Sequence, residues 1–188
     1  FEKLLARDHT LIEPVLIGDA GKIRATATRL GHSLEGIEVI HLPDHRAAAR
    51  RAVALGREGA VEALMKGHLH TDVLLRPALD KQTGLRAGRR FTHVFVMDVP
   101  GLSHPLLVTD AAINIDPDLK TKRDICQNAI DLALSLGIET PKVGVLSAVE
   151  TVNPDMPSSV DAALLSKMAE RGQITGGLVD GPLAMDNA

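Results

Sequence analysis

The sequence has 188 residues, of which 45% are hydrophobic, so it is long enough to form one domain or two small ones around a buried core. Its 24 acidic residues exceed its 21 lysines and arginines, which argues against a general nucleic-acid-binding protein because no excess of cations is available to neutralise phosphates. The three phenylalanines are its only aromatic residues. A surface on which bases stack is therefore not expected either.

The single cysteine, Cys126, cannot form an internal disulfide, which favours a reducing compartment. No stretch approaches the ~18 consecutive apolar residues that a membrane-spanning helix needs. We therefore expect a cytoplasmic protein that contacts neither a membrane nor nucleic acid.

Short apolar stretches alternate with helical patterns along the chain, which predicts an α/β protein with mostly parallel or mixed sheets. Several of the stretches are hydrophobic throughout, as is typical of strands covered on both faces. The predicted strands are 14–18, 37–41, 61–65, 93–98, 105–110, 142–148 and 176–181.

A basic helix is predicted over 45–56, with Arg46, Arg50 and Arg51 on a solvated face. The segment KGHLHTDVLLRPAL (66–79) follows the third predicted strand. It offers a cation at Lys66, and Thr71 or Asp72 can cap a helix whose positive end attracts an anion.

Arg76 lies one turn further along that predicted helix. Lys66 and Arg76 at a helix start suit a phosphate group, because lysine supplies a point charge and arginine a bidentate fork. A solvated helix without a ligand is the alternative. His68 and His70 form an H-x-H pair, but no compact cluster of further metal ligands accompanies them, so no metal is expected.

The loop 99–105 contains two prolines and a glycine between two predicted strands. It is the clearest candidate for a domain boundary. We expect a first α/β domain over 1–104 and a second over 105–188.

Two helices are predicted in the second half of the chain. The first begins at Asp116 and Pro117, a cap followed by the residue that suits the first helical position, and ends at Gly137. Cys126 lies on its apolar stripe, which favours a small buried side chain over a reactive thiol. The second helix follows Ser158, with Asp161 completing a variant of the capping box, and runs to Gly172; Asp161 and Lys167 are expected at its surface or cap.

Small polar residues gather where predicted strands end, and this is where ligands bind in open α/β sheets. No Ser-His-Asp arrangement, P-loop or G-x-G-x-x-G motif is present. The residues alone therefore predict an anion-binding α/β enzyme. The polar residues that follow strands are Asp110 and Asn114, Ser147 and Asn153, and Asp186.

Long blocks in consecutive order resemble the phosphate acetyltransferase and phosphate butyryltransferase family, from about residue 37 to the last residue. Their form is closest to the butyryl branch and to the acetyl branch fused to a hydratase. The blocks are KGHLHTDVLLRPAL, HVFVMDVP, TDAAINIDPDLKTKRDICQNAIDLALSLGIE, VGVLSAVETVNPDMPSSVDAALLSKMAERGQITGG and VDGPLAMDNA.

The resemblance implies reversible transfer of an acetyl or butyryl group between coenzyme A and inorganic phosphate. It also implies a three-layer α/β/α fold of two domains, similar to isopropylmalate dehydrogenase, with substrates in the interdomain cleft of a homodimer. Coenzyme A would be a substrate, and no metal or other cofactor is implied. A base would generate the thiolate that attacks the acyl phosphate, while cations and hydrogen-bond donors stabilise the developing charge.

The resemblance implies that Arg76 binds substrate, because it matches the arginine position of the family in LLRPAL. In relatives, key catalytic groups come from a Ser-Arg motif that follows the segment equivalent to Asp-Asn-Ala (186–188). This sequence ends before that motif, so no catalytic residue is assigned. A segment absent here would complete the first domain. A catalytically incomplete fragment or dimerisation module, and a related dehydrogenase, are the alternatives. The expected substrate-binding residues are Lys66, His70, Thr71, Arg76, Asp110, Asn114, Ser147, Asn153 and Asp186.

Overall fold

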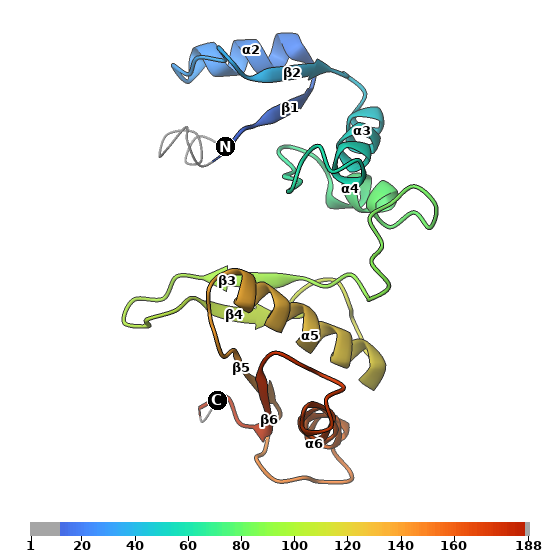
Figure 1. Cartoon of the computed structure of the whole chain (residues 1–188), viewed down its shortest axis with the longest axis vertical. Coiled ribbons are helices and arrows are strands. Elements are labelled where there is room, and N and C mark those ends of the chain that lie inside the picture. Colours follow the sequence, from blue (N-terminus) through green and yellow to red (C-terminus); the bar gives the residue numbers. More distant parts are fainter. Residues whose placement is uncertain (1–11, 187–188) are drawn as a thin grey trace. The chain divides into compact units, whose positions relative to one another are not determined.

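The computed structural model describes residues 12–186 and is shown in Figure 1. Contacts divide the chain into two compact units, Phe1–Ala87 and Gly88–Ala188. Each unit combines helices with a small sheet or sheets, so the predicted mixture of helices and strands is confirmed. Within the described part, no helix is both long and apolar enough to cross a membrane.

The first unit contains a parallel pair of strands, β1 (Val15–Gly18) and β2 (Glu38–His41), joined through α2 (Ala20–Arg29). Two further helices follow, α3 (His45–Arg57) and α4 (Thr71–Ala78). The predicted basic helix is thus confirmed, and α3 contacts both β1 and α4.

Helix α2 is absent from the elements predicted by sequence, although its start carries a clear signal. The Asp19 carboxylate accepts hydrogen bonds from the backbone N–H groups of Gly21 and Lys22, at 2.9 and 3.2 Å. The N–H of Ala20 donates to Nδ1 of His41, at the end of β2, over 3.0 Å. The chain's own side chains therefore satisfy the first amide groups of this helix.

Small and branched apolar side chains hold α3 in place. Ala49 and Val53 are each only 2% exposed, and Ala78 on α4 is also buried. Alanine at such positions lets two helices approach closely, because the interaxial distance depends on the side chains at the contact.

The strand predicted over 61–65 is wrong, because this segment is irregular in the structure. Its apolar residue Leu64 packs beside Gly56 of α3, where a Cβ atom would lie 3.8 Å from Leu64 Cδ1. Leu64 of this segment therefore packs on a helix instead of lying in a strand.

The second unit begins with an antiparallel pair, β3 (Val94–Met97) and β4 (Leu106–Thr109). The loop 99–105 turns between these two strands inside the unit. The domain organisation expected from relatives, with a boundary at 104/105 and a completing C-terminal segment, stays a prediction.

A parallel pair, β5 (Lys142–Leu146) and β6 (Leu178–Leu183), forms the other sheet of the second unit. Helices α5 (Leu119–Ser135) and α6 (Pro157–Glu170) pack on it and on each other. The two sheets of this unit are thus one antiparallel and one parallel pair, which agrees with the predicted mixture of strand directions.

Helix α5 begins two residues later than predicted. Asp118, not Asp116, is its N-cap, and the Asp118 carboxylate accepts a hydrogen bond of 2.8 Å from the N–H of Thr121. Pro117 therefore precedes the cap. The predicted end is confirmed, since Gly137 adopts a φ of 84°, which favours glycine after a helix.

The predicted cap of the next helix is also wrong. Helix α6 starts at Pro157, with Met156 as an N-cap that makes no side-chain hydrogen bond. Proline suits this first position because its missing N–H would have no helical partner. Ser158 lies inside the helix, and its Oγ is 2.9 Å from Oγ of Ser147.

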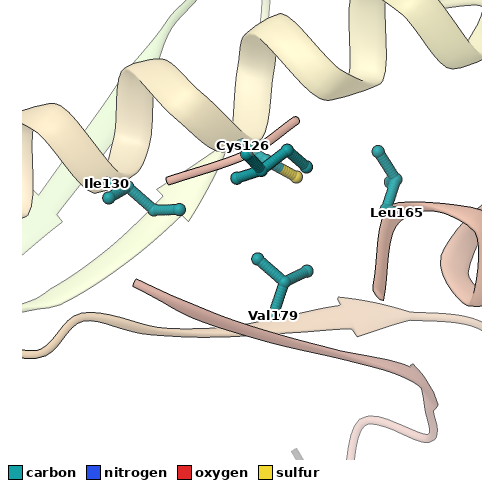
Figure 2. Close-up of a cluster of buried hydrophobic side chains, with 5 residues drawn as sticks. Cys126, Ile130, Leu165 and Val179 are labelled. Carbon is teal, nitrogen blue, oxygen red and sulfur yellow. The ribbon is translucent and has the colours of Figure 1, made fainter. Parts of the chain in front are cut away.

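A hydrophobic cluster joins α5, α6 and β6. Figure 2 shows Cys126 and Ile130 of α5 pointing toward Leu165 of α6 and Val179 of β6. Cys126 is buried, as predicted, and burial raises the pKa of its thiol to about 11. The thiol therefore stays protonated near neutral pH and behaves as a small apolar side chain.

Two further contacts fix α6. A Cβ atom at Gly181 of β6 would lie 2.9 Å from Val145 Cβ and 3.2 Å from Ala162 Cβ, so only glycine allows this approach of β5, β6 and α6. Asp161 accepts a hydrogen bond of 2.6 Å from Lys122 of α5, and Lys167 pairs with Glu170. Asp161 and Lys167, which were predicted at the surface or cap of this helix, therefore each take part in an ion pair.

We predict that Leu165→Ala lowers the free energy of unfolding by about 2–5 kcal/mol, because it removes a buried side chain and leaves a cavity. Leu165 is 1% exposed, whereas its neighbour Leu164 is 43% exposed. Leu164→Ala, the matched control, should cost about 0.5 kcal/mol or less. Urea-induced unfolding measures both values, and equal losses would show that this cluster is not the core of the unit.

Candidate anion-binding site

A hollow with a volume of about 310 Å³ lies along α3 and α4 in the first unit. Helix α3 contributes two arginines to it, and α4 contributes a third arginine with apolar neighbours. The lining residues are Arg46, Arg50, Asp72, Val73, Arg76, Pro77, Asp80 and Thr83.

Helical spacing explains how the arginines come together. Arg46 and Arg50 are four residues apart on α3, so they lie on one face of the helix, and packing of α3 against α4 adds Arg76. Within residues 12–186, none of the three forms an ion pair or a side-chain hydrogen bond. These guanidinium groups thus have donors available for a ligand.

Neighbouring arginines differ in this respect. Arg51, next to Arg50 on α3, forms an ion pair of 3.3 Å with Glu58. The Arg57 guanidinium donates a hydrogen bond to the backbone carbonyl of Gln82. Arg51 and Arg57, which lie on α3 outside the hollow, therefore already have partners within the chain.

Two aspartates also line the hollow, and one of them is used by its own turn. The Asp80 carboxylate accepts hydrogen bonds from Gln82 N, Thr83 N and Thr83 Oγ1 at 2.9, 2.7 and 2.8 Å. These bonds, led by the one from the Thr83 backbone, hold the pKa of Asp80 below its usual value. Asp72 lies in the first turn of α4, where the helix dipole favours an acid. Three arginines against two acids leave the hollow positive.

The other expected residues of the first unit do not line this hollow. Lys66 Nζ donates a hydrogen bond of 3.1 Å to the backbone carbonyl of Leu69, so it closes its own turn. His70 is the N-cap of α4 without a side-chain bond, and Thr71 is the first helical residue, so the predicted cap at Thr71 or Asp72 is wrong. Among the described residues, no three potential metal ligands come together.

In the second unit, Asp110 and Asn114 form one network. The Asp110 carboxylate accepts hydrogen bonds from the backbone N–H groups of His93, Ala112, Ile113 and Asn114 at 3.2–3.3 Å, and from the Asn114 side chain. Burial alone would raise the pKa of Asp110, but these hydrogen bonds outweigh it and hold the pKa below its usual value. Both side chains therefore organise the loop after β4.

Ser147 and Asn153 border the start of α6. Ser147 Oγ contacts Ser158 Oγ and donates to Met156 Sδ over 3.3 Å. The N–H of Asn153 donates to Oγ of the buried Ser159, at 2.9 Å. Asp186 is exposed after β6, and Asn187, which follows it, lies outside the described residues.

The structure thus adds Arg46 and Arg50 to Arg76, whereas the sequence predicted them only on a solvated face. They are indeed exposed, but they line a hollow with a third cation. Their spacing of four residues was the available signal. Which other helix would pack beside them could not be read from that spacing.

Comparison with known sequences identifies the family. The family described as "Phosphate acetyl/butaryl transferase" matches residues 42–188, most of the chain. The chain belongs to this family. The predicted resemblance to phosphate acetyltransferases and butyryltransferases is therefore confirmed.

Individual relatives agree with this assignment. The phosphate acetyltransferase of Rhizobium meliloti is 55% identical over 183 residues, which cover 97% of this chain and 58% of the relative. The phosphate butyryltransferase of Clostridium acetobutylicum is 42% identical over 183 residues, covering 97% of this chain and 61% of the relative. The chain thus spans less than two thirds of the length of these relatives.

A solved structure has a similar fold. A branched-chain phosphotransacylase from Enterococcus faecalis V583 gives a TM-score of 0.72 at 28% identity, over 92% of this chain and 70% of that chain. The fold of this chain is therefore similar to that of a solved phosphotransacylase.

We predict that Asp110→Asn lowers the free energy of unfolding at pH 7 by about 1–3 kcal/mol, because hydrogen bonds to a charged acceptor are weakened. Since the pKa of Asp110 is lowered from 3.8, its contribution is complete above that value and is lost as the pH falls through the lowered one. The difference between wild type and variant should shrink in acid. Chemical denaturation at pH 7 and at pH 3 measures it.

The exposed Asp116 provides the control. Asp116→Asn should change the free energy of unfolding by about 0.5 kcal/mol or less at either pH. A difference for Asp110→Asn that stays constant with pH would contradict the role given to its carboxylate.

Proposed function

We propose that the protein to which this chain belongs transfers an acyl group reversibly between coenzyme A and inorganic phosphate. The match to the phosphate acetyl/butaryl transferase family over residues 42–188 carries this proposal. The hollow on α3 and α4 supports it, because both substrates carry phosphoryl groups and the hollow is lined by three arginines.

In the proposed reaction, the thiolate sulfur of coenzyme A forms a bond to the carbonyl carbon of an acyl phosphate. The carbon–oxygen bond to phosphate breaks, and phosphate leaves with the electron pair. The described residues contribute binding and orientation: Arg76 and its neighbours neutralise anionic groups, so that two negatively charged reactants can come together. The base that takes the thiol proton is not assigned to any residue of this chain.

Finer features belong to the same proposal. We infer a three-layer, two-domain architecture like that of isopropylmalate dehydrogenase, a homodimer, and a cytoplasmic location. Coenzyme A would act as a substrate and not as a bound cofactor. The expected contacts to substrate from Lys66, His70, Thr71 and the polar residues of the second unit stay predictions.

The direct test is an assay of coenzyme A acylation with acetyl phosphate and with butyryl phosphate. The protein is purified from its own source, so that its natural ends are retained. We expect loss of free thiol together with release of phosphate in equal amounts. A protein that oxidises a 2-hydroxy acid with a nicotinamide cofactor, or that dimerises without acylating coenzyme A, would instead be a dehydrogenase or an assembly module.

We predict that Arg76→Ala lowers kcat/KM for acyl transfer about tenfold or more, because a hydrogen bond to a charged group contributes about 1.5–3 kcal/mol. Arg29, exposed at the end of α2, provides the control. Arg29→Ala should leave kcat/KM within about twofold of wild type, the scale of an exposed charge. An unchanged rate for Arg76→Ala would remove this arginine from the substrate site.

A further inference from the structure

We propose that Arg46 and Arg50 of α3 bind phosphoryl groups at the nucleotide end of coenzyme A, in the hollow that they share with Arg76. This inference rests on the proposed function for the identity of the ligand. It assigns a binding role to two α3 residues for which the sequence predicted only a solvated face.

The charges of the hollow are the first argument. Three guanidinium groups line it without an ion pair from residues 12–186, while Asp80 is engaged by Thr83 and by its own turn. Like charges gathered in one place repel each other, so a polyanion that neutralises them is favoured over water. Arg51 on the same helix, which lies outside the hollow, is by contrast paired with Glu58.

The size and lining of the hollow are the second argument. Its volume of about 310 Å³ lies at the lower end of the range for small-molecule sites, about 300–1,000 Å³. Val73 and Pro77 add apolar surface beside the cations. A nucleotide, whose base has flat faces that pack on apolar side chains and which also carries phosphates, uses both kinds of lining, whereas inorganic phosphate uses only the charges.

Side chains of this chain already occupy the starts of α2 and α3. The first amides of α2 are taken by Asp19 and His41, and the N–H of Ala47 at the start of α3 donates to Asp44 over 2.8 Å. A phosphoryl group near these helices would have to displace a carboxylate or an imidazole. The α3–α4 hollow needs no such displacement at its arginines.

Adenosine 3′,5′-bisphosphate, the nucleotide part of coenzyme A, tests the proposal without turnover. Its dissociation constant is measured by titration calorimetry on the protein with its natural ends, at low salt, with inorganic phosphate and adenosine as separate ligands. Wild type should bind the bisphosphate, and binding should weaken as salt is added. Adenosine, which lacks phosphate, should not bind measurably.

The double variant Arg46→Ala/Arg50→Ala should weaken bisphosphate binding about tenfold or more. Arg51→Ala is the matched control, because it removes one cation from the same helix outside the hollow, and it should change the dissociation constant by about twofold or less. The conservative pair Arg46→Lys/Arg50→Lys should restore part of the affinity. Circular dichroism and thermal unfolding confirm that each variant is folded.

The outcomes separate the two proposals. No binding of the bisphosphate to wild type, or equal binding to wild type and to the double variant, overturns the inference even if the protein acylates coenzyme A. Binding of inorganic phosphate alone, with the same dependence on the two arginines, overturns the nucleotide assignment. Arginine-dependent binding of the bisphosphate supports the inference, and the acylation assay then decides the proposed function independently.

Discussion

The contact between α3 and α4 is the constraint on which the first unit depends. Ala49 and Val53 are buried on α3, Ala78 is buried on α4, and the two helices contact each other. That contact brings Arg50 and Arg76, which are 26 positions apart in the sequence, to one hollow.

Four aspartates and the three arginines of the hollow differ in what they bind. Asp19, Asp80, Asp110 and Asp118 all accept backbone N–H bonds, and the pKa of each is lowered. Their carboxylates shape turns and helix starts. The arginines of the hollow make no such internal bonds among the described residues, so their donors are available to a ligand. The geometry therefore gives the carboxylates mainly architectural roles and leaves recognition of anions to guanidinium groups.

The sequence predicted six of the strands and the major helices because their signals are local: apolar runs, helical spacing, and the stop at Gly137. It failed where a neighbour decides the outcome. The segment 61–65 forms no strand, and its Leu64 packs beside Gly56 of α3. Ser158 contacts Ser147 instead of capping α6. The same limit applies to the candidate site. Arg76 was recognised from its motif, but Arg46 and Arg50 became candidates only when the packing of α3 on α4 was seen.

The most direct test of this account is a crystal structure of the protein with coenzyme A bound. We predict that phosphoryl oxygens lie within hydrogen-bonding distance of the guanidinium groups of Arg46 and Arg50, in the hollow along α3 and α4. A structure in which the phosphates of coenzyme A contact other residues, while these arginines stay in solvent, would contradict it.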